Sequence, residues 1–168
     1  MTSSVNAVKG TAMLRTFCKA KLHRATVTDA NVQYTGSLTI DAALMEAADL
    51  LPYEQVHVYD VDNGARLVTY CIEGPRDSGM ICVNGAAARL VSPGDKIIVA
   101  VFAQYSPEEL KTFRPTFILL DERNRIRQVT TEGSSAASGA EALAPEAING
   151  AARRKGAARA RNGHPSPA

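Results

Sequence analysis

Apolar and polar residues alternate along several stretches of the chain, and a period of two predicts strands with one buried face. Segment 16–28 alternates in this way and predicts one or two strands, with its basic side chains on a solvated or site-lining face. Segments 55–61 and 65–72 flank Asp62-Asn63-Gly64 and predict a hairpin, because an Asn-Gly pair accepts the positive φ of a type I′ turn. Further strands are expected at 79–83, at 96–105 and, around a turn, within 116–129.

Two helices interrupt these strands. Residues 41–51 favour a helix, because they are rich in Ala, Leu and Met, Asp41 can cap the start, and a proline follows the end. Ser106 and Glu109 have the spacing of a capping box, which predicts a second, short helix. Segment 92–95 is typical of a β-turn. Short strands, frequent turns and brief helices predict a mainly β protein, a small β-barrel rather than a βαβ sheet.

The composition divides the chain into three parts. Residues 13–129 have the pattern of one compact domain, whereas residues 1–12 are small and polar and are expected to be disordered. Residues 130–168 are rich in Ala, Gly, Ser and Arg and contain almost no large apolar groups. We expect this tail to be disordered, because nothing in it offsets the entropy of ordering. Met1 and Met13 are both candidate start residues.

The charge distribution argues against a nucleic-acid-binding core. The chain has 19 basic and 17 acidic residues, a formal net charge of +2. Five of these basic and three of these acidic residues lie in 130–168, so residues 1–129 carry 14 of each and are neutral. A nucleic-acid-binding domain typically has a basic patch on its folded surface. The excess of positive charge therefore belongs to the tail.

The cysteines and the apolar segments indicate a cytoplasmic protein. Cys18, Cys71 and Cys82 are odd in number and lack CxxC spacing, so we expect free thiols rather than disulfides or a zinc site. The longest apolar run, 97–103, is too short to cross a bilayer. The first ten residues lack the apolar segment of a signal peptide. Neither a membrane nor a bound metal is expected.

Motifs of the common nucleophilic and nucleotide-binding enzymes are missing from the sequence, which has no GxSxG, Walker or GxGxxG pattern. The pair Gly36-Ser37 is a candidate for a different chemistry, although Gly133-Ser134 repeats the dipeptide in the tail. A glycine held in a strained conformation exposes its carbonyl to the next hydroxyl. Attack by Ser37 on Gly36 would give an ester, then dehydroalanine and finally an N-terminal pyruvoyl group. An ordinary turn, or a Ser-His-Asp triad assembled in space, is the alternative.

Five motifs in order along residues 13–121 resemble the pyruvoyl-dependent aspartate 1-decarboxylase family. They are MLRTFCKAKLHRATVTDANVQYTGSLTID, NGARLVTY, ICVNGAAARL, PGDKIIV and FRPTFILLD. The resemblance implies a double-psi β-barrel with two or three short helices, assembled as a homotetramer with active sites between neighbouring subunits. It implies an inactive proenzyme that cleaves itself between Gly36 and Ser37, with or without a maturation factor. The reaction it implies converts L-aspartate to β-alanine and carbon dioxide for pantothenate and coenzyme A biosynthesis.

The resemblance also implies the roles of individual residues. Ser37 would become the pyruvoyl group, whose ketone forms a Schiff base with the substrate amine and acts as an electron sink. Tyr70 would donate the proton that replaces carbon dioxide. Lys21 and Arg66 would hold the two substrate carboxylates, and Thr69 would contribute to binding and processing, although its side chain should lie on the opposite face from Tyr70. The other residues implied are the substrate-binding loop Asn84, Gly85, Ala86 and Ala87, with Tyr34 and His23 near the site.

Each of these residues has an ordinary structural interpretation as well. Lys21 and Arg66 could be surface cations, Tyr70 a core aromatic, and residues 84–87 a simple turn. Two alternative functions follow at the level of the whole chain. The first is a non-enzymatic barrel in which Gly36-Ser37 stays intact, and the second is an enzyme of the same fold that acts on another acidic amino acid, such as glutamate.

Overall fold

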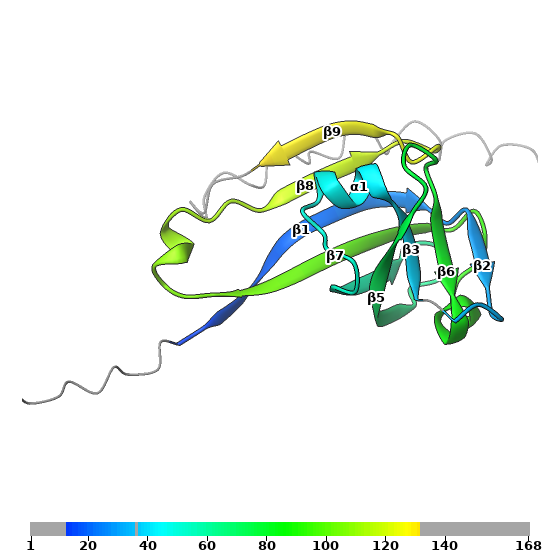
Figure 1. Cartoon of the computed structure of the whole chain (residues 1–168), viewed down its shortest axis with the longest axis horizontal. Coiled ribbons are helices and arrows are strands. Elements are labelled where there is room, and N and C mark those ends of the chain that lie inside the picture. The colour runs from blue at the N-terminus through cyan, green and yellow to red at the C-terminus, as the bar shows by residue number, and fades with distance from the viewer. Residues whose placement is uncertain (1–12, 36, 132–168) are drawn as a thin grey trace, which may run out of the picture. The chain divides into compact units, whose positions relative to one another are not determined.

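The computed structural model describes residues 13–35 and 37–131, and these belong to one compact unit (Figure 1). The two extensions, 1–12 and 132–168, and residue Gly36 lie outside the described residues. The expectations of a disordered N-terminal extension, of a disordered tail and of the geometry of the Gly36–Ser37 bond therefore stay predictions.

Most of the regular structure in the described part of the chain is strand, which confirms the predicted mainly β class. Within residues 13–35 and 37–131, nine strands form one sheet in the order β2-β6-β3-β5-β4-β7-β1-β8-β9. The strands are β1 (Arg15–Thr26), β2 (Asp29–Asn31), β3 (Leu38–Asp41), β4 (Gln55–Asp60), β5 (Arg66–Gly74), β6 (Ile81–Asn84), β7 (Lys96–Tyr105), β8 (Thr116–Leu120) and β9 (Ile126–Thr131). The helices of this part are α1 (Ala42–Ala47) and two 3₁₀ turns, η1 (Gly85–Arg89) and η2 (Glu109–Lys111). None of these helices has the length and apolar character needed to cross a membrane.

One apolar core is shared by strands from both ends of the sheet order. Leu22 of β1, Ile40 of β3, Val58 of β4, Ile81 of β6 and Val99 of β7 are all fully buried in it. Because such distant strands meet in a single cluster, the sheet must curve around the core, as the long strands β1 and β7 do in Figure 1. Alternation along β4, where buried and half-buried residues take turns, is the predicted pattern of a strand with one core face.

The helix predicted at 41–51 is shorter than expected. It spans Ala42–Ala47 and ends in a left-handed residue, Asp49, whose φ is 51°. The N–H of Leu50 then reaches back to the carbonyl of Met45 at 2.9 Å, the long-range bond of a Schellman motif. The favourable composition after Ala47 is therefore overridden by a C-cap that buries Leu50 in the core.

The hairpin predicted around Asn63-Gly64 is confirmed, but the predicted turn type is wrong. Strands β4 and β5 pair antiparallel. Gly64 has a φ of 79°, whereas Asn63 is not among the positive-φ residues of the described chain, and a type I′ turn needs both. The carboxylate of Asp60 accepts the backbone N–H groups of Asp62 at 2.8 Å and of Asn63 at 3.2 Å. The buried Asp60 carboxylate thus stabilises a loop, between the end of β4 at Asp60 and the start of β5 at Arg66, that is longer than a two-residue type I′ turn.

Two local predictions are confirmed in atomic detail. Ser106 and Glu109 form a reciprocal capping box: the Ser106 N–H donates to the Glu109 carboxylate at 2.7 Å, and the Glu109 N–H donates to the Ser106 hydroxyl at 3.3 Å. The turn at 92–95 is closed by the N–H of Asp95 on the carbonyl of Ser92 at 3.1 Å, with Gly94 at a φ of 98°.

Asp41 fastens the end of β3 to the segment that precedes β6. Its buried carboxylate accepts N–H groups of Ala43 at 2.8 Å, Asp77 at 3.0 Å and Gly79 at 2.7 Å. Replacing Asp41 with Ala would leave these donors without their acceptor, so we expect the free energy of unfolding to fall by about 2 kcal/mol or more. Urea denaturation at one fixed protein concentration measures the change.

The control for this prediction is Glu122→Ala, which removes an exposed carboxylate and should change stability by less than about 0.5 kcal/mol. Equal denaturation midpoints for Asp41→Ala and Glu122→Ala would contradict the stabilising role of Asp41.

Candidate active site

Ser37 lies one residue before β3, the strand that runs between β5 and β6. Leu38 pairs with Cys71 of the parallel strand β5, so the register carried back by one residue puts Ser37 level with Tyr70. On the other side, the carbonyl of Ser37 accepts the N–H of Asn84 at 2.8 Å. The half-buried serine is thus hydrogen-bonded to one residue that was predicted to share its site, Asn84, and lies level by register with another, Tyr70.

Asn84 is 3% exposed, and its side chain is engaged inside the sheet. Its amide nitrogen donates to the Thr39 hydroxyl at 3.0 Å, and its amide oxygen accepts the Cys82 thiol at 3.2 Å. These contacts fix the end of β6. Asn84 therefore reaches Ser37 through its backbone N–H, while its side chain maintains the β3–β6 pair.

The small residues of the predicted substrate loop follow Asn84 directly and form η1. Gly85 has a φ of 59°, which lets the chain turn sharply out of β6. Ala86 is exposed, and Gly85 and Ala87 are half-buried. This segment therefore begins next to the residue whose backbone binds the Ser37 carbonyl.

Strand β5 presents the remaining predicted residues on two faces, as alternation requires. Arg66 and Tyr70 are exposed on the outer face, whereas Thr69 is half-buried on the inner face. Tyr70 is 39% exposed and its ring packs against Tyr53, with ring centroids 6.1 Å apart. The guanidinium carbon of Arg66 lies 4.9 Å from the ring centroid of Tyr59. Tyr70 and Arg66 thus share one face but differ in their distance along the strand from Ser37.

Lys21 lies on β1, away from Ser37 in the sheet order. It pairs with Ala100 of β7, which pairs with His57 of β4, which in turn pairs with Val68 of β5. This row places Lys21 on the same face as Arg66, with β7 and β4 between their strands. The Lys21 ammonium instead lies 4.7 Å from the centroid of the Phe117 ring. Within one chain, Ser37 is thus hydrogen-bonded to Asn84 and lies level with Tyr70 by register, whereas β7 and β4 come between the strand of Lys21 and β5 in the sheet order.

His23 and Tyr34, which were expected near the site, lie in different surroundings. His23 is half-buried on β1, and its Nδ1 is the one buried side-chain nitrogen or oxygen without a hydrogen-bond partner in the part of the chain that the structure describes. Burial lowers the pKa of His23, and the positive charges of Lys21 and Arg24 lower it further. Tyr34 is exposed in the turn that precedes Gly36.

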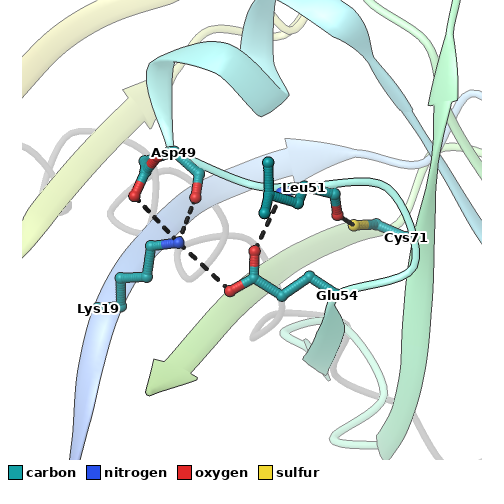
Figure 2. A network of polar contacts seen from close by, with 5 residues as sticks. All are labelled: Lys19, Asp49, Leu51, Glu54 and Cys71. Atoms are coloured by element: carbon teal, nitrogen blue, oxygen red, sulfur yellow. Dashed lines mark hydrogen bonds and ion pairs between the residues drawn. The ribbon is translucent and has the colours of Figure 1, made fainter. Parts of the chain in front are cut away.

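A polar network that the sequence did not reveal holds the turn between α1 and β4 (Figure 2). The Lys19 ammonium contacts the backbone carbonyl of Asp49, the Asp49 carboxylate at 3.1 Å and the Glu54 carboxylate at 3.3 Å. Glu54 also accepts the N–H of Leu51 at 3.0 Å, and the Cys71 thiol donates to the Leu51 carbonyl at 3.2 Å. The partners of Lys19 are 30 and 35 residues away, so no local spacing could indicate them.

The charges in this network determine how Lys19 is protonated. Burial lowers the pKa of Lys19, but the hydrogen bond to Asp49 and the negative charges of Glu54 and Asp49 outweigh it and raise the pKa above its ordinary value. Lys19 therefore stays positively charged, which keeps both carboxylates attached to β1.

Two hollows of the described surface are lined by other residues. One of about 520 Å³ is lined by residues of β1, β4 and β7, among them His57, Phe102 and Gln104. Another of about 410 Å³ lies beside Arg24 and Asp121. Neither of these two is lined by Ser37, Tyr70 or Asn84, whose relation follows from the register of β3, β5 and β6.

The sequence profile of the family described as aspartate decarboxylase matches residues 13–127. The chain belongs to the aspartate decarboxylase family. This confirms the family that the motifs indicated, and the curved nine-stranded sheet agrees with the double-psi β-barrel of that family.

Several curated members of the aspartate decarboxylase family are close in sequence. The aspartate 1-decarboxylase of Clostridium beijerinckii is 50% identical over 123 residues, which cover 73% of this chain and 99% of that protein. That of Lactiplantibacillus plantarum is 55% identical over 114 residues, 68% of this chain and 88% of its own length. That of Syntrophus aciditrophicus is 56% identical over 115 residues, 68% of this chain and 99% of its own length. The similarity thus spans nearly the whole length of these aspartate decarboxylases.

Proposed function

We propose that the protein is a carboxy-lyase that converts L-aspartate to β-alanine and carbon dioxide, a step of pantothenate biosynthesis. The observation that carries the proposal is the position of Ser37 in a chain of the aspartate decarboxylase family. Its carbonyl is bound by Asn84 on one side, and Tyr70 lies level with it on the other. A reactive group made at position 37 would therefore lie beside a phenol that can carry a proton.

We propose that Ser37 becomes a pyruvoyl group through self-cleavage of the Gly36–Ser37 bond. The Ser37 hydroxyl attacks the Gly36 carbonyl carbon and the C–N bond breaks, so the amide becomes an ester. Elimination then releases the Gly36 carboxyl group, and hydrolysis of the resulting dehydroalanine releases ammonia and leaves a ketone. The bond from the Asn84 N–H to the Ser37 carbonyl fits this role, because it would keep the new chain end in place.

The pyruvoyl ketone would supply the electron sink that decarboxylation at the α-carbon requires. Tyr70 would hold a proton at its phenol oxygen and deliver it to the α-carbon once carbon dioxide has left. Thr69 lies on the opposite face of β5, so we propose that it contributes through its backbone or from another subunit. The loop Asn84-Gly85-Ala86-Ala87 would bound the substrate beside Ser37.

We propose that Arg66 and Lys21 hold the two carboxylates of aspartate and that the protein works as a homotetramer. A guanidinium binds a carboxylate through two hydrogen bonds and so orients it. Within one chain, β4 and β7 separate the strands of Arg66 and Lys21. A site between neighbouring subunits would bring Arg66 of one subunit to Lys21 of another. We therefore propose that the active site lies between subunits of the homotetramer. A maturation factor is a further proposed partner, and unaided cleavage of the purified chain would argue against it.

The family match and the cysteines bear on the domain bounds and the location of the protein. We propose that residues 13–129 are the catalytic domain, which the family match to residues 13–127 supports. Cys18, Cys71 and Cys82 form no disulfide in the described structure, which supports our proposal of a reducing, cytoplasmic location.

A substrate comparison tests the proposed function. The purified protein should form β-alanine and carbon dioxide from L-aspartate, and should turn over L-glutamate far more slowly, because the longer side chain misplaces its second carboxylate. Chromatography of the amino acids measures both reactions. Faster turnover of glutamate would favour the enzyme of another acidic amino acid, and an uncut chain without turnover would favour the non-enzymatic barrel.

A further inference from the structure

Tyr53 is held in a backbone conformation that a large side chain rarely adopts. Its φ is 71°, in the left-handed region that costs energy for residues other than glycine and asparagine. The residue is 76% exposed, so burial in the core does not offset this cost. A strained, exposed aromatic residue next to the candidate site needs another explanation.

The backbone around Tyr53 is fastened to β5 immediately after Tyr70. The Tyr53 N–H donates to the carbonyl of Cys71 at 2.8 Å, and the Cys71 N–H donates to the carbonyl of Glu54 at 3.0 Å. The Glu54 carboxylate is in turn held by Lys19 of β1 (Figure 2). These bonds fix the turn with respect to β5, so they also fix the direction in which the Tyr53 side chain leaves the backbone.

The Tyr53 side chain is directed at the ring of Tyr70. The two ring centroids are 6.1 Å apart and the ring planes are inclined by 40°, within the range of favourable aromatic pairs. Tyr70 is itself 39% exposed on the outer face of β5, where its cross-strand neighbour is Gln55. An exposed tyrosine can change rotamer easily, and a neighbouring ring restricts that freedom.

We propose that Tyr53 is a positioning residue whose ring keeps the Tyr70 phenol in its place beside Ser37. The inference rests on the proposed function, because it assumes that Tyr70 transfers a proton in the decarboxylation. Lys19, Asp49 and Glu54 act one step further away, by holding the turn that carries Tyr53.

Three substitutions separate the ring of Tyr53 from its hydroxyl and its backbone. Tyr53→Phe keeps the ring, whereas Tyr53→Asn and Tyr53→Gly remove it and suit a positive φ, so both should fold. Leu51→Asn is the control, since it changes an exposed side chain of the same turn that is not paired with Tyr70. Mass spectrometry and thermal melting first show that all four variants are cut and folded like the wild type.

The kinetic result expected is a loss in kcat. Tyr53→Asn and Tyr53→Gly should lower kcat by roughly two- to tenfold, the equivalent of one aromatic pair, with little change in KM. Tyr53→Phe and Leu51→Asn should stay within about twofold of the wild type. A rise in KM, or an equal loss in Tyr53→Phe, would mean that Tyr53 contacts the substrate and would overturn the positioning role.

A readout that does not depend on activity separates this inference from the proposed function. Protein grown with 3-fluorotyrosine carries five labelled tyrosines, and Tyr70→Phe identifies the ¹⁹F resonance of Tyr70. Tyr53→Asn should shift this resonance, and Tyr53→Phe should leave it in place. An unshifted resonance would overturn the contact between the rings, whether or not the wild type makes β-alanine. A shifted resonance in a protein without decarboxylase activity would support the contact and refute only the proposed function.

Discussion

Replacing Ser37 with Ala is expected to give a single uncut chain without decarboxylase activity. The variant lacks the hydroxyl that would attack the Gly36 carbonyl, so neither the ester nor the ketone can form. The fold should be unaffected, because the contact of residue 37 with Asn84 is made by the backbone carbonyl, which alanine retains. A denaturing gel and intact mass measure the result: the wild type should give fragments 1–36 and 37–168, and the variant one chain of 17.9 kDa.

The chain supplies a matched control for this experiment. Gly133-Ser134 repeats the dipeptide outside the family match, so Ser134→Ala should be cut and active like the wild type. Fragments 1–36 and 37–168 from the Ser37→Ala variant would refute self-processing by this hydroxyl. Loss of cleavage in Ser134→Ala would show that the site of processing had been placed wrongly.

Replacing Tyr70 with Phe is expected to preserve cleavage and to lower kcat by ~10²–10⁴-fold, the usual effect of losing a proton donor. The phenylalanine ring keeps the packing against Tyr53, so the change removes the phenol oxygen and little else. The rate of β-alanine formation, divided by the amount of cut chain found by mass spectrometry, measures the effect on turnover alone.

Tyr105→Phe is the control for the Tyr70 experiment. Tyr105 lies at the end of β7 and its ring packs against Phe113, with centroids 4.6 Å apart. Removing its hydroxyl should leave kcat unchanged. If Tyr70→Phe also turned over at the wild-type rate, Tyr70 would have no part in the proton transfer, and the positioning role of Tyr53 would lose its purpose.

Local sequence patterns predicted the strands, caps and hairpins whose stabilising contacts join residues close together in the sequence. The strand at 96–105 was predicted within its observed bounds, since its apolar run is typical of a buried strand. The capping box of Ser106 and Glu109 was predicted because its two hydrogen bonds join residues three positions apart. The pairing of β4 with β5 followed from two alternating segments that a short loop connects.

Predictions were wrong where distant packing decided between local alternatives. The helix after Asp41 stops at Ala47 although helix-favouring residues continue, because burying Leu50 in the core favours a left-handed Asp49. The loop after β4 is not a type I′ turn, because the buried Asp60 offers its N–H groups a better acceptor. Helix and turn propensities take no account of the burial of Leu50 or of the hydrogen bonds to Asp60.

The sequence by itself determined the family, the mainly β class and the candidate residues Ser37, Tyr70 and Asn84, because motifs and alternation are properties of neighbouring positions. Only the tertiary structure decided which of them meet. The pairing of β3 with β5 and β6 brings together residues that are more than 30 positions apart in the chain. The backbone bonds of Tyr53 and Glu54 to Cys71 of β5, with the ion pairs of Lys19, place the Tyr53 ring against Tyr70. Such long-range contacts depend on strand order and register, which are set by how the whole sheet buries its core.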